Sequence, residues 1–265
     1  MVSHRAQPSG RECVVTDTEI EVRGLTKRFS GVLATDNLSL NIRRGETHAI
    51  IGPNGAGKTT LIAQLQGELR PDEGSIYFAG LDITRKPAYQ RAALGIARSF
   101  QITSVFPKYP VIGNVALAVQ AKVGHSFRFW HTAWSDVELL EPARESIARV
   151  GLSGREHVLA ENLSHGEHRQ LELAMALAMQ PRLLLLDEPM AGISRQDGAR
   201  MIRLLAELKQ SYTVVLVEHD MNTVFAIADR ITVLTAGRAI ASGMPAEIRS
   251  NPQVRAAYLG HRHQG

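Results

Sequence analysis

The sequence has almost no cysteine and no long apolar segment. Cys13 is the only cysteine among 265 residues, so no disulfide can form within the chain, and a reducing compartment fits this composition. No stretch of about 18 consecutive apolar residues is present, which excludes a transmembrane helix. Residues 1–18 also lack the apolar segment of a signal peptide, and we expect them to form a flexible polar tail.

Clustered basic charge is missing as well. The net charge is +4, from 30 Lys and Arg residues against 26 Asp and Glu residues, and the basic residues are scattered along the chain. A solvated surface explains this pattern better than nucleic acid binding does, although an anionic membrane surface nearby is compatible with it. The chain is 44% hydrophobic and long enough for one large α/β domain or two small ones.

A glycine-rich turn is the most informative feature that is present. It joins a predicted strand at residues 48–51 to a predicted helix at 60–65 and has the pattern G-x-x-x-x-G-K-T. The glycines allow backbone N–H groups to face a polyphosphate, and the helix adds the positive end of its dipole. Lys58 can reach the β- and γ-phosphates, and the Thr59 hydroxyl can hold Mg²⁺. A turn that only reverses the chain would not need Lys-Thr in register, so the motif predicts ATP or GTP binding. The predicted site consists of Gly52, Pro53, Asn54, Gly55, Ala56, Gly57, Lys58, Thr59 and Thr60.

An acidic pair follows a second apolar stretch. Residues 183–186 are all leucine, which is typical of a strand buried on both faces. Asp187 and Glu188 then fall at the carboxyl end of that strand, where nucleotides bind in open α/β sheets. We predict that Asp187 holds Mg²⁺ through water opposite Thr59, and that Glu188 is the general base for the attacking water.

A polar segment opens the helix that precedes this strand. Ser164 and Glu167, with His165 and Gly166 between them, have the spacing of a capping box, which by itself explains the segment. Because helix N-termini also bind phosphate, the same cap could hold a second nucleotide.

A histidine follows the third apolar strand. His219 comes after residues 214–217 and Glu218. A lone histidine is usually structural, but this one falls at the sheet edge that should also carry Lys58 and Asp187. We therefore predict a contact between His219 and the γ-phosphate.

The order of the elements predicts an α/β core with a helical insertion. Residues of about 104–160 contain no strong strand and have helical stretches at 111–121 and 136–150. Their aromatic side chains favour packing within the insertion over a patch that faces a partner. These aromatic residues are Phe127, Phe129, Trp130 and Trp134. The other predicted strands lie at 19–22, 38–42 and 75–78, with a hairpin at 231–241, and the other helices lie at 164–180, 195–210 and 245–259.

Together, these motifs resemble an ATP-binding cassette (ABC) ATPase, the motor subunit of an ABC transporter. Residues 52–59 resemble the Walker A motif, 183–188 the Walker B motif and 163–167 the LSGGQ signature. The resemblance implies a P-loop NTPase cassette with a RecA-like core, an antiparallel β subdomain and a helical subdomain. It implies one domain at residues 19–260, with the helical insertion at about 104–180, and tails at 1–18 and 261–265.

The resemblance also implies roles for residues outside the two Walker motifs. Gln101 falls at the Q-loop glutamine and is assigned to catalysis and to Mg²⁺, and His219 matches the switch histidine. Phe29 falls at the aromatic position that stacks on adenine, with a core phenylalanine at a strand end as the alternative. The signature residues Ser164, His165, Gly166 and Glu167 are assigned to the ATP of a second cassette.

Some residues depart from the family pattern. His165 replaces a glycine and Glu167 a glutamine, so the His165 side chain must point away from the phosphate. The D-loop, residues 191–194, ends in Ser194 where the family usually has aspartate. The Ala-Gly of this D-loop, together with residues 217–221 and 257–260, is similar to the ATPases of branched-chain amino acid uptake systems, whose close relatives carry urea, short amides or aromatic acids.

The implied function is an ATP-hydrolysing motor that uses ATP and Mg²⁺ to drive import of branched-chain amino acids, with urea, short amides or aromatic acids as alternative solutes. The implied partners are a second cassette (identical or paralogous), membrane permease subunits and, indirectly, a periplasmic solute-binding protein, with no nucleic acid. The implied location of the protein is cytoplasmic, on the inner face of the plasma membrane. A soluble ABC ATPase of translation or repair would carry two cassettes or long coiled coils, and this chain has one cassette and no heptads. A scaffold without turnover would lack a catalytic residue, yet Glu188 and His219 are present.

Overall fold

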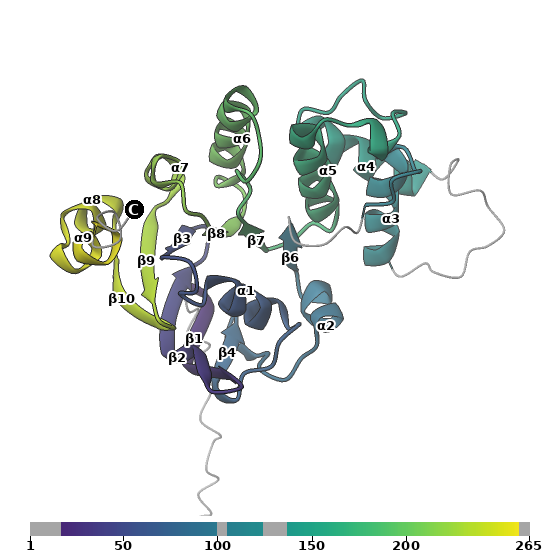
Figure 1. Cartoon of the computed structure of the whole chain (residues 1–265). Coiled ribbons are helices and arrows are strands. Elements are labelled where there is room, and N and C mark those ends of the chain that lie inside the picture. Colours follow the sequence, from purple (N-terminus) through teal and green to yellow (C-terminus); the bar gives the residue numbers. More distant parts are fainter. Residues whose placement is uncertain (1–16, 100–104, 124–136, 260–265) are drawn as a thin grey trace, which may run out of the picture.

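The computed structural model describes residues 17–99, 105–123 and 137–259 (Figure 1). It contains a four-stranded antiparallel sheet and a six-stranded, largely parallel sheet, with helices around the second. No helix in these ranges is long and apolar enough to cross a membrane.

The antiparallel sheet has the strand order β2–β1–β4–β5. It consists of β1 (Thr18–Phe29), β2 (Val32–Arg43), β4 (Glu73–Phe78) and β5 (Leu81–Asp82). β1 and β2 extend well beyond the predicted strands at 19–22 and 38–42. Register shifts between Val22 and Leu25, together with Gly24 at a φ of +57°, interrupt the alternation that marks a strand in the sequence.

The six-stranded sheet has the order β10–β9–β3–β8–β7–β6 and is parallel except for β10. All residues of β3, β7 and β8 are buried, which explains their continuous apolar sequences. The carboxyl ends of these three adjacent strands lie at one edge of the sheet. The strands are β3 (Thr47–Ile51), β6 (Ile96–Ser99), β7 (Leu183–Asp187), β8 (Thr213–Val217), β9 (Arg230–Thr235) and β10 (Arg238–Gly243).

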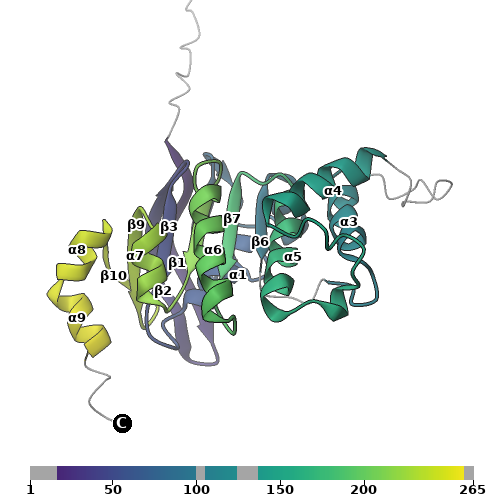
Figure 2. The same ribbon diagram turned by 90° about the horizontal axis from the view of Figure 1, so that it is seen from above.

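Two groups of helices lie at opposite ends of this sheet. α3, α4 and α5 gather beside β6, whereas α8 and α9 lie at the opposite end, beyond β10 (Figures 1 and 2). The helices are α1 (Lys58–Gln66), α2 (Ala88–Ala93), α3 (Val111–Val123), α4 (Val137–Arg149), α5 (His165–Ala178), α6 (Arg195–Leu208), α7 (Met221–Ile227), α8 (Pro245–Ser250) and α9 (Pro252–Leu259), with a short 3₁₀ turn at Ala160–Asn162. This arrangement confirms the predicted α/β fold with an antiparallel sheet and a group of inserted helices.

Alternation along β7 divides its side chains between two hydrophobic cores. Leu183 and Leu185 pack in a core with α1 and the antiparallel sheet. Leu184 and Leu186 pack in a core formed with α3, α4, α5 and α6. Asp187 continues the first set, so its side chain belongs to the face that α1 covers.

A buried arginine fixes the end of α1. The guanidinium of Arg91, on α2, donates to the backbone carbonyls of Gln64 (2.6 Å), Leu65 (2.8 Å) and Lys86 (2.8 Å). The bonds to Gln64 and Leu65 satisfy carbonyls that the C-terminus of α1 leaves free. Burial lowers the pKa of Arg91 to about 10, so the group stays charged at neutral pH. α1, which carries Lys58 and Thr59 at its other end, is thereby held from both the sheet and α2.

Candidate active site

The glycine-rich turn joins β3 to α1 and is held closely between two strands. A Cβ on Gly57 would lie 2.0 Å from the carbonyl oxygen of Ala34, and one on Gly52 would lie 2.3 Å from that of Leu234. Gly57 and Gly55 also have positive φ values, +97° and +79°. Apart from Gly55 itself and its two chain neighbours, no heavy atom lies within 4 Å of the Cβ position of Gly55. The loop is therefore fixed on the side of β2 and β9 and open on the other, as a phosphate-binding cradle requires.

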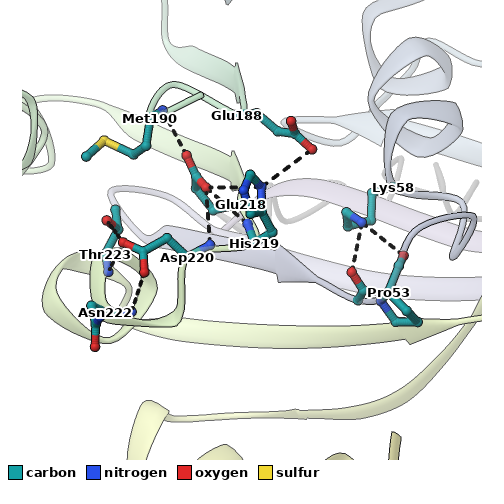
Figure 3. Close-up of polar contacts among 10 residues, drawn as sticks. Pro53, Lys58, Glu188, Met190, Glu218, His219, Asp220, Asn222 and Thr223 are labelled. Atoms are coloured by element: carbon teal, nitrogen blue, oxygen red, sulfur yellow. Dashed lines mark hydrogen bonds and ion pairs between the residues drawn. The ribbon is translucent and has the colours of Figure 1, made fainter. Parts of the chain in front are cut away.

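Lys58 places an ammonium group inside this loop. Its Nζ donates to the carbonyl oxygens of Gly52 (2.8 Å) and Pro53 (3.1 Å), and the residue is buried (Figure 3). Burial lowers the pKa of Lys58, and the carboxylates of Glu188 and Asp187 oppose that shift. The negative charges of Glu188 and Asp187 thus favour the charged form of Lys58.

Glu188 and His219 face each other at the ends of β7 and β8 (Figure 3). Glu188 Oε1 lies 3.8 Å from His219 Nδ1, and both side chains are substantially exposed. The backbone N–H of Glu188 donates to the carbonyl of Val217 at 2.9 Å, which ties the end of β7 to that of β8. Glu188 has a φ of +50°, an unusual value for a residue with a side chain, and such strain is often found at functional sites.

The neighbouring Glu218 connects this pair to Met190, directly before the D-loop. Its carboxylate is fully buried and accepts hydrogen bonds from the backbone N–H groups of Met190 (2.9 Å) and His219 (3.0 Å). Burial raises the pKa of Glu218, and these hydrogen bonds oppose the rise. No role was predicted for Glu218 from the sequence. Its position, as a charged residue directly after a fully apolar strand, was the signal that could have indicated one.

Asp187 is buried and already has a cationic partner. Its Oδ2 accepts from Nη2 of Arg98 at 2.9 Å, a contact that was not predicted from the sequence.

Thr59 is exposed in the first turn of α1. Mg²⁺ prefers hydroxyl and carboxylate oxygens as ligands, so the side chains of Thr59 and Asp187 fit the ion. Within the described ranges, no group of three or more His, Cys, Asp and Glu side chains could hold a metal.

Some predicted residues cannot be placed in this site. Gln101 and the aromatic residues at positions 127–134 lie outside the described residues. β6 ends at Ser99 and pairs with β7, where Ser99 is opposite Leu186.

Phe29 lies at the end of β1 and is 46% exposed. The Lys27 ammonium lies 5.7 Å from its ring centroid. The alternative of a core phenylalanine is wrong, because the ring is accessible. Stacking on adenine stays a prediction.

The predicted capping box at the start of α5 is confirmed. Ser164 Oγ accepts from the Glu167 N–H at 3.3 Å, and Glu167 Oε2 accepts from the Ser164 N–H at 2.8 Å. A Cβ on Gly166 would lie 2.8 Å from Asp197 Cγ, so the segment packs too closely for a larger residue.

The two departures at His165 and Ser194 have structural explanations. His165 Nε2 lies 3.3 Å from the carbonyl oxygen of Ala191, so the imidazole contacts the D-loop segment. Ser194 is the N-cap of α6 and accepts from the Asp197 N–H at 3.2 Å. A serine at the end of this D-loop therefore starts the next helix.

The open glycine loop, its buried lysine and the acidic strand end place the protein among the P-loop nucleoside triphosphatases. Sequence similarity narrows that class. The chain matches a family model described as ABC transporter over residues 35–191, and one described as branched-chain amino acid ATP-binding cassette transporter over residues 240–264. It is 39% identical over 248 residues to the high-affinity branched-chain amino acid transport ATP-binding protein LivG of Salmonella typhimurium, covering 91% of this chain and 97% of that relative.

Solved structures agree with this similarity. The ADP conformation of MJ1267, an ATP-binding cassette of an ABC transporter, has a TM-score of 0.81 and 28% identity, covering 92% of this chain and 100% of that one. The dimeric structure of MJ0796, a bacterial ABC transporter cassette, has a TM-score of 0.74 and 26% identity, covering 85% and 98%. The chain belongs to the ATP-binding cassette family of ABC transporter ATPases, which confirms the resemblance found in the sequence.

Proposed function

We propose that this chain is the ATP-hydrolysing motor subunit of an ABC importer for branched-chain amino acids. The observation that carries the motor role is the meeting of Lys58, Glu188 and His219 at one sheet edge. The solute rests on the relative LivG, whose name gives branched-chain amino acid transport, and on the match at residues 240–264. A repair or translation ATPase is disfavoured, because the chain covers nearly all of a transport relative.

Each residue of the site has a separate task in hydrolysis. The backbone of residues 52–57 and the ammonium of Lys58 bind and orient the phosphates, with Thr60 following in the first turn of α1. Thr59 and Asp187, with Gln101, would hold Mg²⁺, which when bound offsets negative charge on the phosphates. Glu188 takes the proton of the attacking water.

Two further residues complete the proposed site. His219, 3.8 Å from Glu188, contacts the γ-phosphate. Phe29, exposed at the end of β1, stacks on the adenine of ATP.

The proposal also includes a second cassette as a partner of this chain. Ser164 and Gly166 lie at the start of α5, in the group of helices beside β6, whereas Lys58 lies at the start of α1. The backbone N–H groups and dipole of α5 suit a phosphate held by the P-loop of a second copy or a paralogue. The dimeric cassette described above supports such pairing in this fold.

The permease subunits would dock at a groove between α1, α2, β6 and α5. The groove has a volume of about 390 Å³ and is lined mainly by apolar side chains. Tyr89 at its margin is 72% exposed. Docking there places the cassette on the cytoplasmic face of the plasma membrane. The side chains that line the groove include Tyr89, Ile96, Val105, Ala118, Met175 and Met179.

Reconstituted transport tests the motor role and the solute together. The chain is combined in vesicles with the membrane subunits and binding protein encoded beside its gene. We expect ATP-dependent uptake of labelled leucine, isoleucine and valine above that of urea, short amides and aromatic acids. Uptake of one of the latter classes alone would replace the proposed solute, and uptake without this chain would contradict the motor role.

Labelled-ATP filter binding tests the proposed nucleotide contacts. Lys58→Ala removes charge-assisted hydrogen bonds worth about 1.5–3 kcal/mol, so we expect about 10-fold to 100-fold weaker binding. Phe29→Ala should weaken it less, by about 10-fold, within the range of base–aromatic stacking. Tyr89→Ala, which removes an exposed aromatic ring on α2, is the matched control and should bind ATP as the parent does. Parent-like binding by Phe29→Ala would remove Phe29 from the site.

A further inference from the structure

Arg98 is a buried arginine that belongs to none of the motifs found in the sequence. It lies on β6, and its side chain is 3% exposed. One nitrogen of its guanidinium, Nη2, donates to Asp187 Oδ2 at 2.9 Å. A second nitrogen, Nη1, donates to Gln66 Oε1 at 2.7 Å and to Glu68 Oε2 at 2.9 Å. The side chain thus bridges the acidic strand end and the C-terminal end of α1.

The pairing of the strands explains why this bridge forms. β6 and β7 run parallel, with Arg98 opposite Leu185. Asp187 lies two residues beyond Leu185 and so shares its face of the sheet. That face is covered by α1, which ends at Gln66, and Glu68 follows two residues later. An arginine is long enough to span these groups, and its planar fork can bind two of them at once.

The contact leaves Asp187 with one oxygen tied and one free. In the part of the chain that the structure describes, no other side chain makes a hydrogen bond or ion pair with Asp187. We propose that Arg98 is a positioning residue: by holding Oδ2, it turns Oδ1 of Asp187 toward the Mg²⁺ of the ATP site. This inference rests on the proposed function, which gives Asp187 its role at the metal. Partners that orient the ligands of a metal typically affect its affinity by 10-fold to 100-fold.

Arg98 can affect Mg²⁺ binding through its charge or through its contact with Asp187, and the two effects predict opposite results when Arg98 is replaced. A guanidinium near a cation site repels the cation. If this repulsion were the only effect, removing the guanidinium would strengthen Mg²⁺ binding. A guanidinium that orients Asp187 would, when removed, weaken Mg²⁺ binding. Arg98→Lys separates the two effects, because it keeps the charge and loses the two-ended bridge.

Arg98 also lies beside the proposed docking groove. Arg98, Gln66 and Glu68 all line it. The side chain of Arg98 therefore lies between the groove and Asp187.

Equilibrium binding of labelled ATP to the full chain tests the inference. All proteins carry Glu188→Gln, so that ATP is bound without turnover, and binding is measured in EDTA and at increasing Mg²⁺. We expect Arg98→Gln to bind ATP in EDTA as its parent does and to need about tenfold more Mg²⁺ for the half-maximal effect. Arg98→Lys should shift in the same direction by less. Glu68→Gln removes the outer ion pair, keeps the bond to Asp187 and should stay near the parent.

Three results would overturn the inference. An unchanged or lower Mg²⁺ requirement in both Arg98 variants would show that position does not matter. Equal loss of ATP binding with and without Mg²⁺ would show a purely structural role. A parent that binds ATP without any response to Mg²⁺ would count against the proposed metal site itself, and against Arg98 with it. If Arg98→Gln does not fold, as thermal melting would reveal, Arg98→Lys decides alone.

Discussion

Glu188→Gln is expected to reduce ATP hydrolysis by about 10²-fold to 10⁴-fold, the usual contribution of a general base. The amide has nearly the same shape as the carboxylate but cannot take a proton from water. Glu188 follows Asp187 at the end of β7, and its carboxylate is partly exposed and faces His219. ATP binding should persist, because Lys58 and the glycine loop are unchanged. Phosphate release measures turnover, and filter binding measures affinity.

A matched control separates this effect from a general loss of charge. Glu141→Gln changes an exposed glutamate on α4 that pairs only with Arg144 among the described residues, and it should retain parental turnover. Parental turnover in Glu188→Gln would instead remove Glu188 from the mechanism.

ATP-dependent pairing of two cassettes is the second expected result. The Glu188→Gln protein should dimerise with ATP and not with ADP, alone or with a paralogous cassette. Only ATP carries the γ-phosphate that the start of α5 in a second chain could bind. Ser164→Arg should abolish this dimer, because its long cationic side chain occupies the segment that would meet the phosphate. Sedimentation with each nucleotide measures the association.

The arginine variant needs two controls. Loss of the Ser164 cap costs about 0.5–2 kcal/mol of helix stability, so melting and ATP binding by the monomer must be compared with the parent. Ser250→Arg adds the same charge at the end of α8, on the far side of the sheet, and should still dimerise. If no nucleotide-dependent association occurs with itself, a paralogue or the membrane subunits, the proposed motor role fails.

The sequence by itself determined the parts of this site that are contiguous in the chain. The glycine loop, the Leu183–Leu186 strand with its acidic end and the capping box at Ser164 each depend on neighbouring residues. Backbone conformation and helix capping act over a few residues, so their patterns can be read without knowing the fold. The all-leucine strand also revealed that both faces of β7 are covered.

Only the tertiary structure decided which distant groups meet at these motifs. Arg98 reaches Asp187 across 89 residues, Met190 donates to Glu218 across 28, and His165 approaches Ala191 across 26. The first two contacts follow from the strand order β3–β8–β7–β6, which differs from the order in the chain. Strand pairing is set by burial on both faces of the sheet, and no local pattern in the sequence specifies which strands become neighbours.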